Sequence, residues 1–309
     1  MSATMDISVV IPARNRETKL PYCLESVISQ TLPPREIIVV DDRSTDGTRA
    51  VVESYAKHGV RYERLPEGRG AQAARNHGIR SARCDWIAFQ DSDDRWLPTK
   101  LEKQVGALKA NGSSDRLVVI TNGRIVFTDG TRSAPLIEWG FHGNCHRKLL
   151  LRSGPMFPTM LVSKRALDDI GLLDEDCPSY QEWDTAIRLS ERCGFLHLDE
   201  CLFEWVAHND ESISKDPARD LAGHEYVMRK HRAAIIDAHG PVAWRMAVAG
   251  LVARALAFGA FDQAERLAAS ELPALARSLT SALVRRHKSP RRAGTLLKVA
   301  AAIPLGATR

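Results

Sequence analysis

Three carboxylates lie within four residues at Asp91-Ser92-Asp93-Asp94, directly after the apolar run of residues 86–90. Because like charges this close repel one another, the cluster needs a compensating cation. A hard divalent ion such as Mg²⁺ or Mn²⁺ prefers oxygen ligands of this kind. Mg²⁺ commonly takes one or two carboxylates and completes its coordination with substrate phosphates. The residue types therefore predict either a metal site for a phosphorylated substrate or a solvated acidic turn after a strand.

The first third of the chain alternates between two patterns. Short apolar runs rich in β-branched residues are typical of buried strands, and helical patterns separate them. This alternation predicts an α/β fold with a doubly wound, mostly parallel sheet flanked by helices. The predicted strands cover residues 7–11, 37–40, 60–65 and 86–90, and the predicted helices cover residues 18–30, 48–57 and 70–80.

Polar residues follow three of these strands at the point where each strand ends. Residues 12–15 follow the first strand, Asp41 and Asp42 end the second, and the acidic cluster ends the fourth. In doubly wound sheets, ligands bind beyond the carboxyl ends of the strands, near the topological switch point. We therefore expect one crevice bounded by these three strand ends.

The pattern after residue 98 is less regular. The irregular segment 133–158 is typical of a substrate-binding loop, and the chain is helical and alanine-rich from about residue 216 onward. We expect two domains, an α/β domain over residues 1–215 and a helical C-terminal region with a basic tail over residues 216–309. Other expected elements are helices at 99–110, 164–170 and 181–193, a hairpin at 117–131, and strands at 159–162 and 201–207.

Cysteine usage and the N-terminus suggest an intracellular setting. The six cysteines include no C-x-x-C pair, a pattern typical of reduced thiols in a cytosolic protein. The N-terminus lacks a basic segment followed by an apolar region, so no secretory signal is expected. No uncharged apolar stretch reaches the ~18 residues that a membrane-spanning helix needs. We therefore expect a cytoplasmic protein.

The net charge of +5 comes from the C-terminal segment. Residues 272–309 contain eight Lys and Arg residues and no Asp or Glu, whereas the rest of the chain has 35 basic and 38 acidic residues. One interpretation is a solvated basic tail. Another is peripheral contact with the inner face of a membrane, because basic clusters attract anionic lipid. Nucleic-acid binding is not expected, because the cluster lacks interleaved aromatic residues.

Five motifs follow one another along the chain: residues 8–15, 38–48, Gly70 with 74–78, 91–98 (with the DxD motif), and 180–184 with Arg188 and Leu189. In this order they resemble the motifs of family 2 glycosyltransferases of the GT-A fold. The resemblance covers about residues 5–215. It implies a bacterial-type enzyme of polysaccharide biosynthesis that transfers a sugar, with inversion, from a nucleotide-diphosphate sugar (a UDP-sugar is expected) to a glycan or lipid-linked acceptor.

The resemblance also implies roles for individual residues around the donor. Mn²⁺ or Mg²⁺ would bridge the donor diphosphate and the protein. Arg75 lies where its cation meets a phosphate oxygen or holds Asp42 in place, and a purely structural ion pair is the alternative. By position, Pro12, Arg14 and Asn15 enclose the base, Asp42 bonds the uracil or ribose, Asp91 holds the ribose or the metal's shell, and Asp93 ligates the metal. His208 would lie near the metal or the diphosphate, and an ordinary surface or loop histidine is the alternative.

An acceptor hydroxyl is a weak nucleophile until a general base removes its proton. In the family's acidic base motif, Glu182 is our candidate, although the family more often has Asp at this position. Asp184 is an alternative, and a third interpretation assigns neither residue a catalytic role. Because residues two apart on a helix point about 200° away from each other, only one of them can face the crevice.

Two other functions are compatible with parts of this pattern. A nucleotidyltransferase shares a related sheet and an acidic metal site, but it would have a glycine-rich phosphate loop where this chain has residues 12–16, without glycine. A non-catalytic protein that binds nucleotide sugars is the other alternative. The motifs do not define the donor sugar or the acceptor, because loops rather than nucleotide motifs select them.

Overall fold

The computed structural model describes residues 5–137, 140–207 and 216–285. The chain divides into two compact units. The first, called the sheet unit, comprises residues 1–146, 154–176 and 181–210. The second, called the helical unit, comprises residues 147–153, 177–180 and 211–309. The expected division of the chain between residues 215 and 216 stays a prediction.

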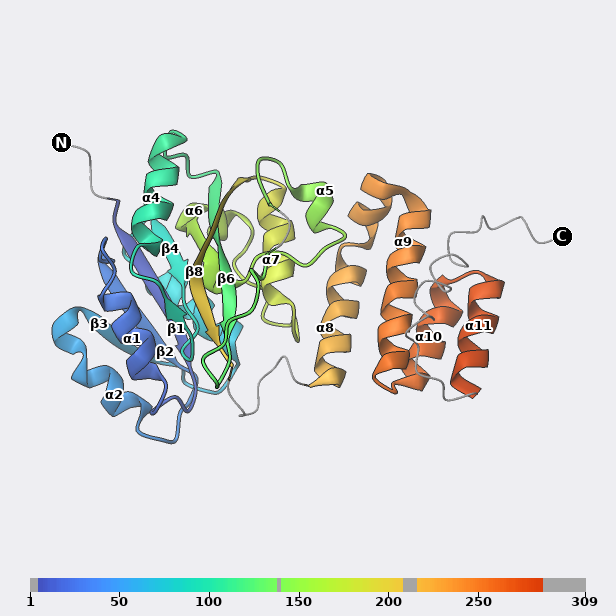
Figure 1. Ribbon diagram of the computed structural model, residues 1–309, viewed down its shortest axis with the longest axis horizontal. Coiled ribbons are helices and arrows are strands. Elements are labelled where there is room, and N and C mark those ends of the chain that lie inside the picture. The colour runs from blue at the N-terminus through green and yellow to red at the C-terminus, as the bar shows by residue number, and fades with distance from the viewer. Residues whose placement is uncertain (1–4, 138–139, 208–215, 286–309) are drawn as a thin grey trace. The chain divides into compact units, whose positions relative to one another are not determined.

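An eight-stranded mixed sheet forms the sheet unit, in the order β3-β2-β1-β4-β7-β6-β8-β5 (Figure 1). The pairs β1–β2, β2–β3, β1–β4 and β6–β8 are parallel, and the pairs β4–β7, β6–β7 and β5–β8 are antiparallel. The strands are β1 (Ile7–Ala13), β2 (Glu36–Asp41), β3 (Val60–Arg64), β4 (Trp86–Phe89), β5 (Arg95–Trp96), β6 (Leu117–Val126), β7 (Met160–Ser163) and β8 (Gly194–Val206).

Helices cover both faces of this sheet. Along β1 the side chains alternate between the faces, and Val9 belongs to a core cluster with Leu24 of α1 and Leu101 of α4. Val10 faces α3, where a Cβ at Gly78 would lie 2.5 Å from its Cγ1, so only glycine allows this close packing. These helices are α1 (Leu20–Ile28), α2 (Thr48–Ser54), α3 (Ala71–Ser81), α4 (Lys100–Ala110), α6 (Lys164–Asp169) and α7 (Gln181–Ser190), with 3₁₀ turns η1 (Ala56–His58) and η2 (Phe157–Thr159). The short helix α5 (His146–Leu149) begins at His146, and its other residues belong to the helical unit.

The predicted α/β fold, with helices flanking a sheet, is confirmed. Because β1 lies between β2 and β4 and is parallel to both, the polar ends of these three strands lie at one edge of the sheet. Of the expected hairpin, β6 is the first strand, and the chain after the turn returns antiparallel to it through the bridge between Val126 and Arg132. The amide of Phe127 donates to the carbonyl of Thr131, and that of Ser133 donates to the carbonyl of Ile125, both at 2.9 Å. The loop at 133–158 contains the short helix α5 and the start of η2.

The helical unit contains four helices among its described residues: α8 (Pro217–Lys230), α9 (Arg232–Ala257), α10 (Phe261–Glu271) and α11 (Ala274–Arg285). Asp216 caps the start of α8 by accepting hydrogen bonds from the amides of Ala218 and Arg219. A break at Gly240, which has a φ of +82° and precedes Pro241, divides α9. Within the part of the chain that is described, no helix is long and apolar enough to cross a membrane. The basic tail beyond residue 285 lies outside the described residues.

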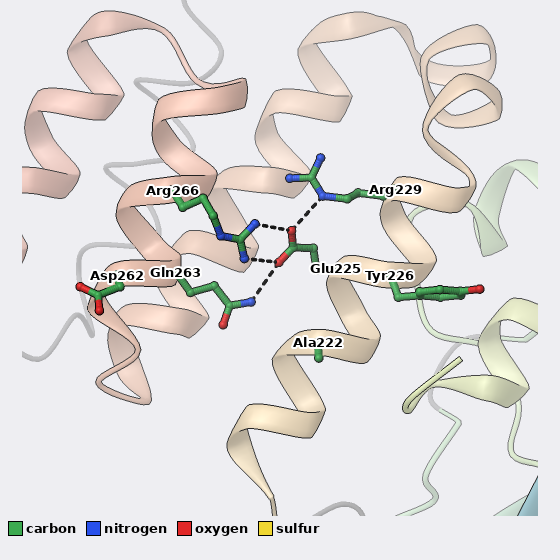
Figure 2. Close-up of a pocket in the computed structure, with 7 residues that line it drawn as sticks. All are labelled: Ala222, Glu225, Tyr226, Arg229, Asp262, Gln263 and Arg266. Atoms are coloured by element: carbon green, nitrogen blue, oxygen red, sulfur yellow. Dashed lines mark hydrogen bonds and ion pairs between the residues drawn. The ribbon is translucent and has the colours of Figure 1, made fainter. Parts of the chain in front are cut away.

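A network of charged side chains joins α8 to α10 (Figure 2). Glu225 accepts two hydrogen bonds from Arg266, at 3.0 and 3.1 Å, one from Arg229 at 2.8 Å and one from Gln263 at 3.0 Å. Although burial works to raise the pKa of Glu225, these hydrogen bonds outweigh it and lower the pKa to about 2. Glu225, Arg229 and Arg266 line a groove of about 520 Å³ on the helical unit. Because the charges of these three side chains compensate one another, their role is to hold α8 and α10 together.

The depressed pKa of Glu225 predicts that the helical unit loses stability in acid. The stabilisation is fully present above the ordinary value of 4.5 and is lost as the pH falls toward about 2. Glu225→Gln should lower the free energy of unfolding by ~2 kcal/mol at about pH 7 and by much less at about pH 3. Urea unfolding followed by circular dichroism measures this difference. Glu265→Gln, at an exposed position of α10, is the control, and an equal loss at both pH values would contradict the prediction.

Candidate active site

Two arginines compensate the first two carboxylates that follow β4. Arg75 Nη2 lies 2.6 Å from Asp91 Oδ1, and Arg16 Nη2 lies 3.2 Å from Asp93 Oδ2. The turn itself is closed by the amide of Asp94, which donates to the carbonyl of Asp91 at 3.2 Å. The acidic cluster is therefore an ordered turn held in place by cations from α3 and from the end of β1.

The third carboxylate, Asp94, is buried. Burial, followed by the charges of Asp91 and Asp93, raises the pKa of Asp94 well above its usual range. Its Oδ1 accepts a hydrogen bond from the amide of Val206, the last residue of β8, at 3.0 Å. Asp94 thus ties the end of β8 to the acidic turn, while Asp91 and Asp93 remain partly exposed.

Arg75 is held on several sides. Its Nη1 donates to Gln72 Oε1 at 3.0 Å, and its guanidinium lies 4.6 Å from the centre of the Phe157 ring. Of the alternatives for this residue, the one in which it holds Asp42 is not observed, because its carboxylate partner is Asp91. Arg75 lies one turn beyond the start of α3. Asp42 instead contacts the backbone just before this helix begins.

Asp42 is buried beneath the loop that leads into α3. Its two carboxylate oxygens accept hydrogen bonds from the amides of Arg69 at 2.7 Å and Gly70 at 3.0 Å, and the exposed Arg14 lies 3.6 Å away. Gly70 has a φ of +89°, a conformation that favours glycine. A carboxylate has about four positions that can accept a hydrogen bond, and two of those of Asp42 are occupied by these amides. Asp42 can therefore accept a further hydrogen bond.

The neighbouring Asp41 has a different environment. It accepts hydrogen bonds from the amide of Ser44 at 2.7 Å and from the hydroxyl of Tyr62 at 2.6 Å. Burial, with this hydrogen bond, raises the pKa of Tyr62 to about 12. Asp41 therefore fixes the end of β2, and Asp42 is the member of the pair that lies toward α3.

The end of β1 is joined to the turn after β2. The amide of Asn15 donates to Ser44 Oγ at 2.9 Å, and its side-chain Oδ1 accepts from the amide of Thr45 at 2.9 Å. Asn15 has a φ of +53°, in the left-handed region. Pro12 is buried in β1, and Arg14 is exposed at its end. These residues lie at the same sheet edge as Asp42 and the acidic turn.

Glu182 lies in the first turn of α7 and is partly buried. Burial raises its pKa, whereas the positive charge of Arg75 lowers it and the negative charge of Asp91 raises it again. Glu182 is therefore close enough to the Arg75–Asp91 pair to feel both charges. A carboxylate with a raised pKa suits general base catalysis, because the ideal base has a pKa near the working pH.

Asp184 points into the protein and is 0% exposed. Its Oδ2 accepts from Arg188 Nε at 2.8 Å. Arg188 also donates to the carbonyls of Ile170 and Leu172, at 2.8 and 2.6 Å. Asp184 therefore anchors α7 to the segment after α6, which leaves Glu182 as the acid at the charged cluster.

Asp91 and Asp93 are candidate ligands for a divalent cation. Among the described residues, no group of three or more His, Cys, Asp or Glu side chains is arranged to hold a metal ion. Asp91 and Asp93 nevertheless fit Mg²⁺ or Mn²⁺, because such ions take one or two carboxylates together with substrate phosphates. His208 lies outside the described residues.

The sequence analysis assigned no role to Arg16, a charged residue of this site. Arg16 pairs with Asp93 and also donates to the carbonyls of Arg14 and Asn15, both at 3.3 Å. Its position directly after the polar end of the first strand is the sequence signal for this role.

Comparison with known proteins identifies the class of enzyme. Residues 8–171 match the family described as Glycosyl transferase family 2. Because this match covers more than half of the chain, the protein belongs to that family and is a glycosyltransferase. The family match also decides against the nucleotidyltransferase and non-catalytic alternatives.

Individual relatives agree with this assignment. An uncharacterized glycosyltransferase of Haemophilus influenzae is 28% identical over 228 residues, which cover 73% of this chain and 76% of that protein. The UDP-Glc:alpha-D-GlcNAc-diphosphoundecaprenol beta-1,3-glucosyltransferase WfgD of Escherichia coli is 33% identical over 197 residues, covering 62% of this chain and 74% of WfgD. Other relatives are matched over less of their own length, for example 40% of one from Bacillus subtilis.

A solved structure has a similar fold. The structure of S. aureus TarS 1-349 in complex with UDP-GlcNAc superposes with a TM-score of 0.59 at 19% sequence identity, covering 96% of this chain and 90% of that chain. At this identity the similarity shows the fold alone. The expected GT-A fold is confirmed.

The two acids of α7 should differ in their effect on stability. Asp184→Ala leaves Arg188 without its carboxylate, so we expect the free energy of unfolding to fall by ~3 kcal/mol. Glu182→Gln should leave it unchanged or raise it, because burial disfavours the charged form of Glu182 at neutral pH. Chemical denaturation at neutral pH measures both, with Glu191→Gln, at the exposed end of the same segment, as the control. Equal destabilisation by the two substitutions would contradict this division of roles.

Proposed function

We propose that the protein transfers a sugar from a nucleotide-diphosphate sugar, specifically a UDP-sugar, to a hydroxyl of a glycan or lipid-linked acceptor, with inversion at the anomeric carbon. The observation that carries this proposal is the position of Glu182, a partly buried carboxylate with a raised pKa beside the Arg75–Asp91 pair. In this proposal, the cationic and metal-binding side for the leaving diphosphate would lie next to a base for the incoming hydroxyl.

The donor would bind at the sheet edge formed by β2, β1 and β4. Asp42 would accept a hydrogen bond from the uracil or ribose, and Pro12, Arg14 and Asn15 would enclose the base. WfgD is named as a glucosyltransferase that uses UDP-Glc, and TarS forms a complex with UDP-GlcNAc, which supports a uridine nucleotide here. Asp91 would hold the ribose or an outer ligand of the metal.

A divalent cation, Mg²⁺ or Mn²⁺, would neutralise charge on the leaving diphosphate when bound. Asp93 would hold it, and His208 is proposed to assist. Asp93 now pairs with Arg16, whose cation would also be available to the diphosphate. Arg75 is paired with Asp91, and in this proposal it would add a fixed positive charge near the leaving group.

Glu182 would take the proton of the acceptor hydroxyl as the oxygen attacks the anomeric carbon. Attack from the face opposite the diphosphate forms the new glycosidic bond as the bond to the leaving group breaks, so a single displacement inverts the configuration. Because the pKa of Glu182 is raised, its carboxylate is a stronger base than an ordinary glutamate.

The acceptor is proposed by analogy with WfgD, whose name specifies a diphosphoundecaprenol-linked sugar. A lipid-linked acceptor would suit an enzyme that works at the inner face of a membrane, with the basic tail as the contact. The tail lies outside the described residues, so this contact is a proposal from the sequence alone.

Donor use can be tested with a panel of nucleotide sugars. We expect slow, metal-dependent release of UDP from one UDP-sugar by the purified protein, measured with Mn²⁺ or Mg²⁺ and lost when EDTA is added. Asp93→Ala should reduce this release by at least ~100-fold, because the diphosphate loses its metal.

Glu53→Gln is the control, since Glu53 is an exposed residue of α2 paired with Arg49. It should retain the wild-type rate. If no nucleotide sugar binds or reacts with metal present and the protein folded, the proposed donor is wrong. If Asp93→Ala releases UDP at the wild-type rate, the proposed metal ligand is wrong.

A further inference from the structure

We propose that Glu175 positions the loop that contacts Asp42 and thereby sets the affinity for the nucleotide. This inference rests on the proposed function, in which Asp42 bonds the uracil or ribose of the donor. The loop, called the donor loop, comprises residues 66–70, between β3 and α3. Glu175 lies between α6 and α7, and both segments belong to the sheet unit.

The donor loop contacts Asp42 through its backbone. The amides of Arg69 and Gly70 donate to the two carboxylate oxygens of Asp42, at 2.7 and 3.0 Å. A Cβ at Gly68 would lie 3.9 Å from Asp42 Oδ1 and 3.6 Å from Arg14 Nη1, so the loop lies directly against two of the proposed donor residues. Because the bonds to Asp42 come from main-chain amides, the orientation of this carboxylate depends on where the backbone of the loop lies.

Arg69 ties the donor loop to another segment of the sheet unit. Its Nη2 lies 2.8 Å from Glu175 Oε2, whereas the exposed Glu67, within the loop itself, lies 4.0 Å from its Nε. Gly68 and Gly70, on either side of Arg69, give the backbone more conformational freedom than other residues would. The ion pair of Arg69 and Glu175 therefore restrains a stretch of chain that its own sequence leaves loose.

Glu175 is itself held by α3. Its second oxygen, Oε1, accepts a hydrogen bond from Asn76 Nδ2 at 2.8 Å. The Asn76 side chain also donates to the carbonyl of Leu173 and accepts from the amide of Leu173, both at 2.9 Å. Because Asn76 is 2% exposed, water competes little for these bonds. One oxygen of Glu175 is thus fixed to the helix, and the other pairs with the donor loop.

The segment that carries Glu175 is also fixed to α7. Two of its backbone carbonyls, those of Ile170 and Leu172, accept hydrogen bonds from Arg188 at 2.8 and 2.6 Å. All of these contacts lie within the sheet unit. The segment is therefore a fixed support, and the ion pair of Glu175 with Arg69 links the donor loop to it.

Loss of this ion pair should change nucleotide binding rather than stability. A partly exposed ion pair contributes little to the free energy of unfolding. Without it, however, the donor loop would hold the conformation that orients Asp42 for only a fraction of the time, and the apparent affinity falls by that fraction. Glu175 is a positioning residue in this scheme, because it acts through the loop rather than by touching substrate.

The test removes the charge of Glu175 and keeps its shape. Glu175→Gln should raise the Kd for UDP, measured by calorimetry in the presence of Mn²⁺, by ~10-fold, as expected if the loop is ordered about a tenth of the time. The urea midpoint of unfolding should stay the same, and so should the rate of UDP release at saturating donor, because Asp93 and Glu182 lie on other segments. Asp169→Asn is the matched control, since Asp169 forms a similar ion pair with Arg116 at 2.7 Å, just before β6, and it should keep the wild-type Kd.

A double-mutant cycle separates this role from a general structural effect. Arg69→Ala should raise the Kd for UDP, and in that background Glu175→Gln should raise it no further, because the ion pair is already gone. An equal loss of affinity from Glu175→Gln in both backgrounds, or a lower rate of UDP release with an unchanged Kd, would overturn the inference. If UDP does not bind the folded wild-type protein with Mn²⁺ present, the proposed donor is wrong. If the wild type binds UDP and Glu175→Gln binds it as tightly as Asp169→Asn does, only the inference fails.

Discussion

Repulsion among three carboxylates at the end of β4 constrains the arrangement of the whole site. Asp94 escapes it by burial beneath the end of β8, with a raised pKa. Asp91 and Asp93 stay partly exposed, and each has an arginine partner from another segment, Arg75 and Arg16. Arg16 can reach the turn because β1 lies beside β4 in the sheet. Arg75 reaches it from α3. We propose a divalent cation at this turn, because Mg²⁺ and Mn²⁺ take one or two carboxylates together with substrate phosphates.

In two of the acidic motifs, one carboxylate holds the backbone and its neighbour is the one proposed to act on substrate. Asp41 fixes the end of β2, while Asp42 accepts hydrogen bonds from the loop before α3. Asp184 is buried and anchors α7 through Arg188, while Glu182 is close enough to Arg75 and Asp91 for their charges to affect its pKa. Acids that are neighbours in the sequence therefore have different environments.

Local patterns were enough to predict the first half of the fold. The β-branched runs 7–11 and 37–40 and the helical periods between strands depend only on neighbouring residues, so they were predicted within a few positions. The partner of Arg75 could not be predicted, because it depends on how α3 lies across β4. The pairing of Arg69 with Glu175 was likewise not apparent, since it joins segments that are far apart in the sequence.

The central claim is that Glu182 acts on the acceptor while the strand ends bind the donor. The most direct measurement compares wild type and Glu182→Gln by calorimetric titration with the donor in the presence of Mn²⁺, alongside sugar transfer to an acceptor. We expect the same Kd for the donor in both proteins, and a rate of sugar transfer at least ~100-fold lower in the variant. Transfer at the wild-type rate by Glu182→Gln, or loss of donor binding in that variant, would contradict it.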